Sequence, residues 1–208
     1  MMDLSGTSPP STAISTAVAA TAAAMISAPH EPMPTPRPFS WFALVEGSGG
    51  GYENNVLPLG TCDSIQDFFR YFNHVPLPGA VFDGRHVWKI AKTHVGYGIC
   101  FFETGIHPQW EDPRNKHGVD LVHRASFEAS ELSEAWTSIL FMFITDELPG
   151  ATGARVAYKT DRRGAPFHKL EVWTRTSNDA AAIIATLREH TGLDFEDIPR
   201  RTGGCTRR

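Results

Sequence analysis

The chain has 208 residues, of which 41% are hydrophobic, and its formal net charge is −4 at pH 7. This length allows one domain plus a tail, and the hydrophobic content is enough for a real core. The acidic balance excludes a protein that coats nucleic acid through bulk charge, so any nucleic-acid contact must be local.

The cysteines and the amino-terminal region indicate the compartment. Cys62, Cys100 and Cys205 are odd in number and far apart, which argues against a disulfide framework or a zinc site and favours a reducing compartment. The Ala-rich run at 17–28 could pass for the apolar core of a signal peptide. No Lys or Arg precedes it, however, and signal peptides carry positive charge there, so secretion is not expected. No run of about 18 strongly apolar residues occurs, so we expect a cytoplasmic protein that does not enter a membrane.

Composition divides the chain into three parts. Residues 1–36 are rich in Ala, Ser, Thr and Pro and bury too little to offset their ordering entropy, so a disordered tail is expected. Prolines recur from Pro29 to Pro38 and predict an extended arm. Residues 37–199 are predicted to form the folded domain, and 200–208 a basic tail.

The first predicted strand is Phe39–Val45. A Gly-rich loop at 47–51 follows and ends at Tyr52, whose ring could move onto a ligand. Asp63–Phe72 is predicted to be a helix with Asp63 as its N-cap, because apolar residues recur there at helical spacing. Phe69 lies at the edge of this apolar stripe and could be core or be exposed to a partner.

Strand-like segments follow at 87–90, 97–103 and 119–124, and the stretch with sequence GIHPQWED lies between the last two. In that stretch, Trp110 places an indole beside the carboxylate of Glu111. Such a pair suits a flat, cationic ligand that donates hydrogen bonds, such as N7-methylated guanine, because the ring stacks on the indole and the carboxylate accepts the edge donors. The alternative is a half-buried tryptophan beside a solvated glutamate.

The remaining elements complete the fold. Ser130–Thr145 is the longest predicted helix, with Ser130 as N-cap, and strands at 154–160 and 169–174 are expected to pair. A last helix is predicted over Ser177–Thr191. Strands joined by short loops, with three separated helices, predict an α+β fold with an antiparallel sheet. One helix layer would leave the other sheet face open as a shallow concave site.

Five motifs in order, over about residues 39–193, resemble eukaryotic translation initiation factor 4E, the messenger RNA cap-binding family. They are Asp67-Phe68-Phe69 with Phe72-Asn73-His74, Gly105 to Asp112 with Asn115-Lys116-x-Gly118, Glu134-Ala135-Trp136, Val172-Trp173-Thr174 and Thr191-Gly192-Leu193. The Pro-rich arm, the extra residues between His74 and Tyr97 and the compact length resemble kinetoplastid members. The resemblance implies a curved antiparallel β-sheet with three helices packed on its convex face and the cap site on the concave side.

The resemblance also implies roles for individual residues in holding the cap base. Tyr52 and Trp110 would stack on the two faces of the methylated base, Glu111 would bind its edge, and Trp173 would contact the methyl group. The family usually has Trp where this chain has Tyr52, so weaker cap binding is expected.

The cap phosphates need cations, and the resemblance places them on the ribbon before the Val172-Trp173-Thr174 strand. Lys159 and Lys169 match two of the family's cations by position, and Arg162 and Arg163 lie in the loop between them. The alternative for all four is a solvated hairpin tip. Asp120 stands where the family has a basic residue, which lowers phosphate affinity unless this strand is shifted in register.

A scaffold partner with a Tyr-x-x-x-x-Leu-Φ helix is implied for the back of the molecule. Pro34, Phe69, Thr137 and Phe141 are the expected contacts there, and Phe69 replaces a tryptophan of the family, so specificity could be altered.

The expected function is binding of the 7-methylguanosine cap of messenger RNA and recruitment of a scaffold protein for translation initiation. The alternatives are a cap-binding translational repressor or specialised paralogue, a cap or nucleotide hydrolase, and a generic single-strand RNA binder. We expect no enzyme, catalytic residue, cofactor or metal, because Glu111, Asp112 and Asp120 are the only local carboxylate cluster and the histidines lack zinc-ligand spacing. Outside the complex, the protein is expected to be a monomer.

Overall fold

The computed structural model describes residues 31–46, 55–84, 88–90 and 94–199. Every element below belongs to the second of the two units into which the chain divides, Met33–Arg208. Tyr52 lies outside the described residues, so its predicted role stays a prediction.

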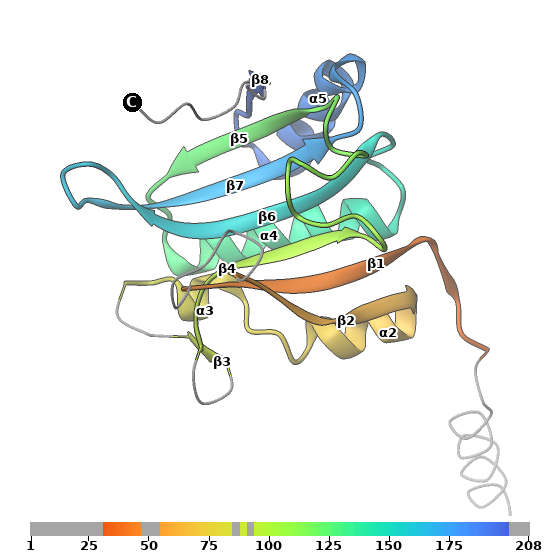
Figure 1. Ribbon diagram of the computed structural model, residues 1–208, viewed down its shortest axis with the longest axis horizontal. Helices are drawn as coiled ribbons and strands as arrows, with labels where there is room; N and C mark the ends of the chain where they lie inside the picture. Colours follow the sequence, from red (N-terminus) through yellow and green to blue (C-terminus); the bar gives the residue numbers. More distant parts are fainter. Residues whose placement is uncertain (1–30, 47–54, 85–87, 91–93, 200–208) are drawn as a thin grey trace, which may run out of the picture. The chain divides into compact units, whose positions relative to one another are not determined.

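The described chain forms a curved, unclosed antiparallel sheet with helices against it (Figure 1). In chain order the elements are β1 (Pro34–Val45), β2 (Val56–Ser64), α2 (Ile65–Phe72), α3 (Pro78–Val81), β3 (Trp88–Ile90), β4 (His94–Glu103), β5 (Val119–Ala125), α4 (Ala129–Ile144), β6 (Ala151–Thr160), β7 (Pro166–Thr174), the 3-10 turn η2 (Ser177–Asp179), α5 (Ala180–Thr191) and β8 (Glu196–Pro199). The strand order is β2-β1-β4-β6-β7-β5-β8, with β3 paired to β4. The predicted α+β class is confirmed.

The two faces of the sheet carry different apolar clusters, because alternate residues of a strand point to opposite faces. Phe39 and Phe101 belong to the large core, which they share with residues of α2, α4 and α5. Phe42, Phe102 and Trp173 belong to a smaller cluster that contains no helix residue. The face that carries this smaller cluster is called the open face below.

Helix α4 supplies much of the large core. Trp136, Ile139 and Phe143 are at most 1% exposed, and the Phe143 ring packs edge-on against Phe39 and Phe101, with centroids 5.8 and 6.1 Å apart. Helical spacing places these side chains on one stripe, so α4 is fixed against the middle of the sheet.

Two predicted helix caps were wrong, and the last α-helix begins at Ala180 rather than at the predicted Ser177, which lies in the 3-10 turn η2. Asp63 belongs to β2, and the N-cap of α2 is Ser64, whose hydroxyl accepts the Asp67 N–H at 3.2 Å. Helix α4 begins one residue before Ser130, with Glu128 as N-cap in a capping box with Glu131. In α2 the cap lies one residue after the predicted one, and in α4 it lies two residues before it; in both helices the cap side chain accepts a backbone N–H of the first turn.

Strand β1 begins at Pro34 rather than at the predicted Phe39. Pro34 pairs with Ser64, and the neighbouring Met33 N–H donates to Gln66 Oε1 at 3.0 Å. Pairing of β1 with β4 starts only at Phe39. The prolines therefore lie where β1 has a single neighbouring strand, the position at which proline is tolerated in a sheet.

Candidate functional site

The loop between β4 and β5 is built around one carboxylate. Asp112 accepts the backbone N–H of His107 and of Arg114, each at 2.9 Å. Because Asp112 closes this turn, Trp110 and Glu111 stand outside it: both are exposed, and the Trp110 side chain is 47% exposed. The pair predicted to hold a cationic base is thus presented to solvent on a structured loop.

A buried amide ties this loop to the sheet. Asn115 is 0% exposed, and its Nδ2 donates to the carbonyl oxygens of His107 and Gln109 at 2.9 and 2.8 Å. The Thr152 hydroxyl of β6 donates to Asn115 Oδ1 at 2.7 Å and lies 3.3 Å from the Trp173 carbonyl oxygen. Hydrogen bonds therefore connect the loop that carries Trp110 to the strand that carries Trp173.

Trp173 lies in the floor of the open face rather than on its surface. It is 2% exposed, and Phe102 packs edge-on against it with centroids 5.3 Å apart. Ile106 of the loop joins the same apolar cluster. The Arg155 guanidinium lies over the indole, 5.2 Å from its centroid, so a ligand on the open face would meet Arg155 beside Trp173.

Cations gather on β6 and β7 around a buried acid. Glu171 is 0% exposed and forms ion pairs with Arg155 through Nε and with Lys169 through Nζ, the latter at 2.6 Å. Burial would raise the pKa of Glu171, but the two cations outweigh it and hold that pKa below its ordinary value. Lys159 Nζ lies 4.3 Å from the ring centroid of Tyr97. Burial, followed by the charge of Arg155, lowers the pKa of Lys159.

The hairpin between β6 and β7 carries two more predicted phosphate ligands. Asp161 Oδ1 accepts the backbone N–H of Arg163 and of Ala165, each at 2.8 Å, and Gly164 takes a φ of 83°. Arg162 and Arg163 are exposed at this turn. All four predicted phosphate-binding residues therefore lie on one two-stranded ribbon.

Asp120 lies on the open face. It pairs with Trp173 across β5 and β7 in a register without irregularity, and side chains of directly opposed residues share a face. The structure therefore has no register shift between β5 and β7 that would move the Asp120 carboxylate off this face.

Two of the predicted partner-binding residues, Phe69 and Phe141, contact each other on the side of the sheet that α2, α4 and α5 cover, which is called the helix face below. Phe69 of α2 and Phe141 of α4 are 40% and 38% exposed, with ring centroids 6.2 Å apart. Phe72 lies 5.8 Å from Phe141. Thr137 precedes Phe141 by one turn of α4, and Pro34 pairs with the N-cap residue of α2. We call Phe69, Phe72 and Phe141 the aromatic patch.

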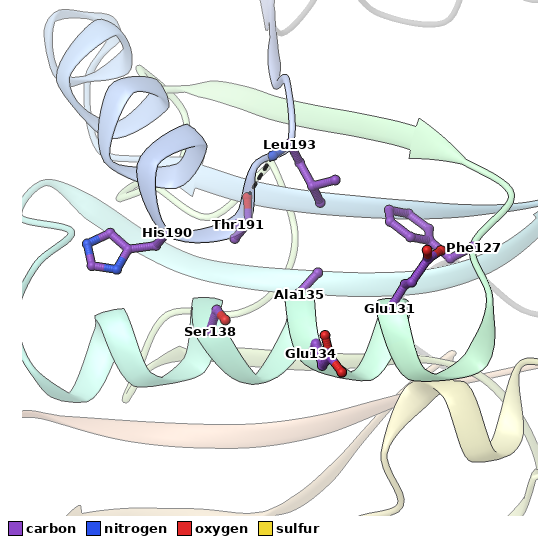
Figure 2. A pocket seen from close by; sticks show the side chains of 8 residues that line it. All are labelled: Phe127, Glu131, Glu134, Ala135, Ser138, His190, Thr191 and Leu193. Carbon is purple, nitrogen blue, oxygen red and sulfur yellow. Dashed lines mark hydrogen bonds between the residues drawn. The ribbon is translucent and has the colours of Figure 1, made fainter.

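Several hollows lie in the described part of the chain. One of about 360 Å³ lies beside the Trp110 loop, lined by Phe42, Val56, Pro58, His107 and Gln109. A second of about 360 Å³ lies between α4 and the end of α5, where Figure 2 shows Glu131 and Glu134 with His190 and Leu193 around it. A third, about 330 Å³, lies at the start of α4 beside His168. The first of these adjoins the predicted site, because His107 and Gln109 belong to the Trp110 loop.

Among the residues that the structure describes, no three His, Cys, Asp or Glu side chains are grouped so as to hold a metal ion. The helices described are all too short or too polar to cross a membrane.

Sequence reasoning missed Arg155 and Glu171. Strand alternation could have found them, since Arg155 and Lys159 on one strand, and Lys169, Glu171 and Trp173 on the next, recur at every second or fourth position and so share a face.

Comparisons with known proteins agree with these observations. The family described as Eukaryotic initiation factor 4E matches residues 39–198. The chain is 31% identical over 158 residues to Eukaryotic translation initiation factor 4E-2 of Schizosaccharomyces pombe, covering 76% of this chain and 58% of that protein. It is 27% identical over 167 residues to the human type 1B factor, covering 76% of this chain and 62% of the relative. It thus spans less than two thirds of the length of both relatives.

In structure, the chain is similar to schistosome eIF4E complexed with m7GpppG and 4E-BP, with a TM-score of 0.63 and 19% identity. This match covers 85% of this chain and 97% of that chain, and it shows the shared fold.

Proposed function

The chain belongs to the eukaryotic initiation factor 4E family, and from this membership we propose that it binds the 7-methylguanosine cap of messenger RNA and recruits a scaffold protein for translation initiation. The observation that carries the proposal is the exposed Trp110–Glu111 pair on a loop hydrogen-bonded to the strand of Trp173. It is supported by the schistosome relative, whose structure holds both m7GpppG and 4E-BP.

The cap base is held by stacking and by one acid. Trp110 covers one face of the methylated base and Tyr52 the other, each ring contributing roughly 1–3 kcal/mol. Glu111 accepts the two adjacent donors on the base's edge, and Trp173 contacts the methyl group. A neutral guanine has no positive charge and therefore lacks the cation–π attraction to the two rings, so the site prefers the methylated base.

The triphosphate follows the β6–β7 ribbon away from the base. Lys159 and Lys169 contact it from the strands, and Arg162 and Arg163 reach it from the hairpin, whose backbone is held by Asp161. Asp120 on the same face weakens this attraction. Binding therefore weakens as salt rises, because phosphate contacts release counterions.

The scaffold protein binds the helix face. A helix with a Tyr-x-x-x-x-Leu-Φ motif lays its apolar side on the aromatic patch, beside Thr137 and Pro34. Phe69 supplies apolar area there but no indole N–H, which makes the preferred partner sequence differ from that of family members with tryptophan.

We further propose that the protein acts in the cytoplasm, without catalysis, as a monomer outside its complexes. Residues 37–199 are the proposed cap-binding domain, between the tails at 1–36 and 200–208.

Retention on a 7-methyl-GTP matrix tests the base site. Trp110→Ala and Glu111→Ala should each abolish retention while the circular dichroism spectrum stays that of the wild type, because both residues are exposed. Lys116→Ala is the matched control, since Lys116 is an exposed residue of the same loop. Wild-type retention by both site variants would remove the assignment.

A further inference from the structure

The buried carboxylate of Glu171 lies between two cations on the open face. Its Oε2 binds Arg155 Nε and its Oε1 binds Lys169 Nζ at 2.6 Å. The side chains of Arg155 and Lys169 are 15% and 21% exposed. One carboxylate therefore holds two partly exposed cations, one on each oxygen.

This acid stays charged although it is buried. Burial raises its pKa, but Arg155 and Lys169 lower it further than burial raises it, so the net shift is downward. Without Glu171, the guanidinium and the ammonium group would lose the carboxylate that both of them bind, and their mutual repulsion would be less compensated. Glu171 is thus a partner that the two cations share.

Glu171, Arg155 and Lys169 lie along the path proposed for the cap phosphates. Arg155 pairs with Glu171, Ala157 with Lys169, and Lys159 with Phe167 in every second row of β6 and β7. Positions two apart on a strand point to the same face, at a spacing of roughly 6.6 Å. Cations therefore follow one another from the Trp173 ring, which Arg155 covers, toward the hairpin.

We propose that Glu171 is a positioning residue that holds Arg155 and Lys169 side by side as a preformed cradle for the polyphosphate of the cap, and that Arg155 binds phosphate. The inference rests on the proposed cap binding and adds Arg155 to the cations that the family resemblance implies. Arginine suits this place because its planar fork can donate two parallel hydrogen bonds to phosphate oxygens. Fixing both cations in advance lowers the ordering cost when the anion binds.

The test compares ligands that differ only in phosphate number. Dissociation constants are measured by fluorescence for 7-methylguanosine, its monophosphate and its triphosphate, and the phosphate increment is the affinity of the triphosphate divided by that of the nucleoside. In Glu171→Gln the increment should fall by about tenfold, the size of one charge-assisted hydrogen bond, while nucleoside affinity stays the same.

The sign of this change separates positioning from simple charge. Removing an acid makes the open face more positive, so a Glu171 that acted only as a nearby negative charge would give a larger increment in Glu171→Gln. An increment that is unchanged or larger therefore overturns the proposal.

A double variant covers the case in which Glu171→Gln does not fold. Arg155→Met with Glu171→Leu keeps the net charge and replaces a buried ion pair by apolar groups, a change that folded proteins often tolerate. This double variant should bind 7-methylguanosine like the wild type but should have a smaller phosphate increment. A phosphate increment equal to that of the wild type would overturn the role of Arg155. Arg155→Lys, which keeps the charge without the fork, should lie between the double variant and the wild type.

The control is Arg188→Gln, which removes one cation from α5 on the helix face, where Arg188 is paired with Asp194. It should keep the wild-type increment; an equal loss in this variant would overturn the proposal by showing that net charge alone sets the increment. Failure of cap binding itself has a different signature, because the wild type would then bind 7-methylguanosine no better than guanosine.

Discussion

At the scale of single residues, Asn115 matters most for the shape of the proposed base site. Its side chain is fully buried and bonds two carbonyl oxygens of its own loop and one hydroxyl of β6. Buried polar groups that lose their partners are expensive. Asp112 closes the loop that presents Trp110, and the Asn115 amide ties that loop to the sheet without needing to touch the ligand.

Asn115→Ala should lower the free energy of unfolding by about 2–3 kcal/mol and should weaken binding of 7-methyl-GTP, because the Trp110 loop loses its tie to the sheet. Urea unfolding and a fluorescence titration measure the two effects. Lys116→Ala, one residue further along, should change neither. Wild-type values in Asn115→Ala would show that the loop holds its shape without this amide.

Glu171 should make stability depend on pH. Its pKa in the folded protein lies below the ordinary 4.5, so its contribution to stability is present above pH 4.5 and is lost as the pH falls through the lowered value. The urea midpoint of the wild type should therefore drop more between about pH 6 and pH 3 than that of Glu171→Gln. Parallel curves for the two proteins would contradict this.

At the scale of elements, helices α2 and α4 build the surface proposed for the scaffold protein. Phe69 and Phe141 are large apolar side chains that stay exposed, with Phe68 packed against both beneath them. Exposed aromatic clusters of this kind mark interaction sites more often than isolated apolar residues do.

Phe69→Ala should weaken binding of a Tyr-x-x-x-x-Leu-Φ peptide by at least about tenfold, as the loss of a central aromatic contact does at other interfaces, and should leave cap binding unchanged. Fluorescence polarisation of the labelled peptide measures this. Glu134→Ala, on the α4 flank that faces α5 (Figure 2), is the control and should bind like the wild type. Equal loss in both variants would place the peptide elsewhere.

The sequence predicted these elements unevenly, for physical reasons. Helix α4 and strands β4 to β7 have clear apolar periodicity and were found. Strand β2 contains Pro58 and Gly60, which disfavour strands, and β8 is a four-residue polar strand. Strands β2 and β8 form because the neighbouring strands β1 and β5 supply their hydrogen-bond partners. A pattern of nearby residues does not reveal such a partner. The helix caps at Asp63 and Ser130 were wrong for a related reason, since the preceding chain decides where a helix starts.

At the scale of the whole domain, the proposed sites lie on opposite faces of one sheet. Trp173, Arg155 and Lys169 belong to the open face, whereas the aromatic patch belongs to the helix face. Strand alternation produces this separation, so a cap and a partner helix can be bound together without competing for surface.

The candidate site was predictable where it depends on local sequence and strand alternation. Trp110, Glu111, Lys159 and Lys169 could be named in this way or from the family resemblance. The ion pair of Arg155 with Glu171 depends on the pairing of β6 with β7 and on full burial of the acid, which are long-range facts. Tyr52 lies outside the described residues, so its stacking role stays a prediction.

The central claim is that an electron-rich aromatic site prefers a cationic purine to a neutral one. Titration of the intrinsic tryptophan fluorescence with 7-methyl-GTP and with GTP tests it most directly. We expect quenching by both nucleotides at high concentration, with 7-methyl-GTP bound about tenfold tighter or more, because a desolvated cation–π contact contributes that much. Equal affinity for the two nucleotides, or no quenching by either, would contradict it.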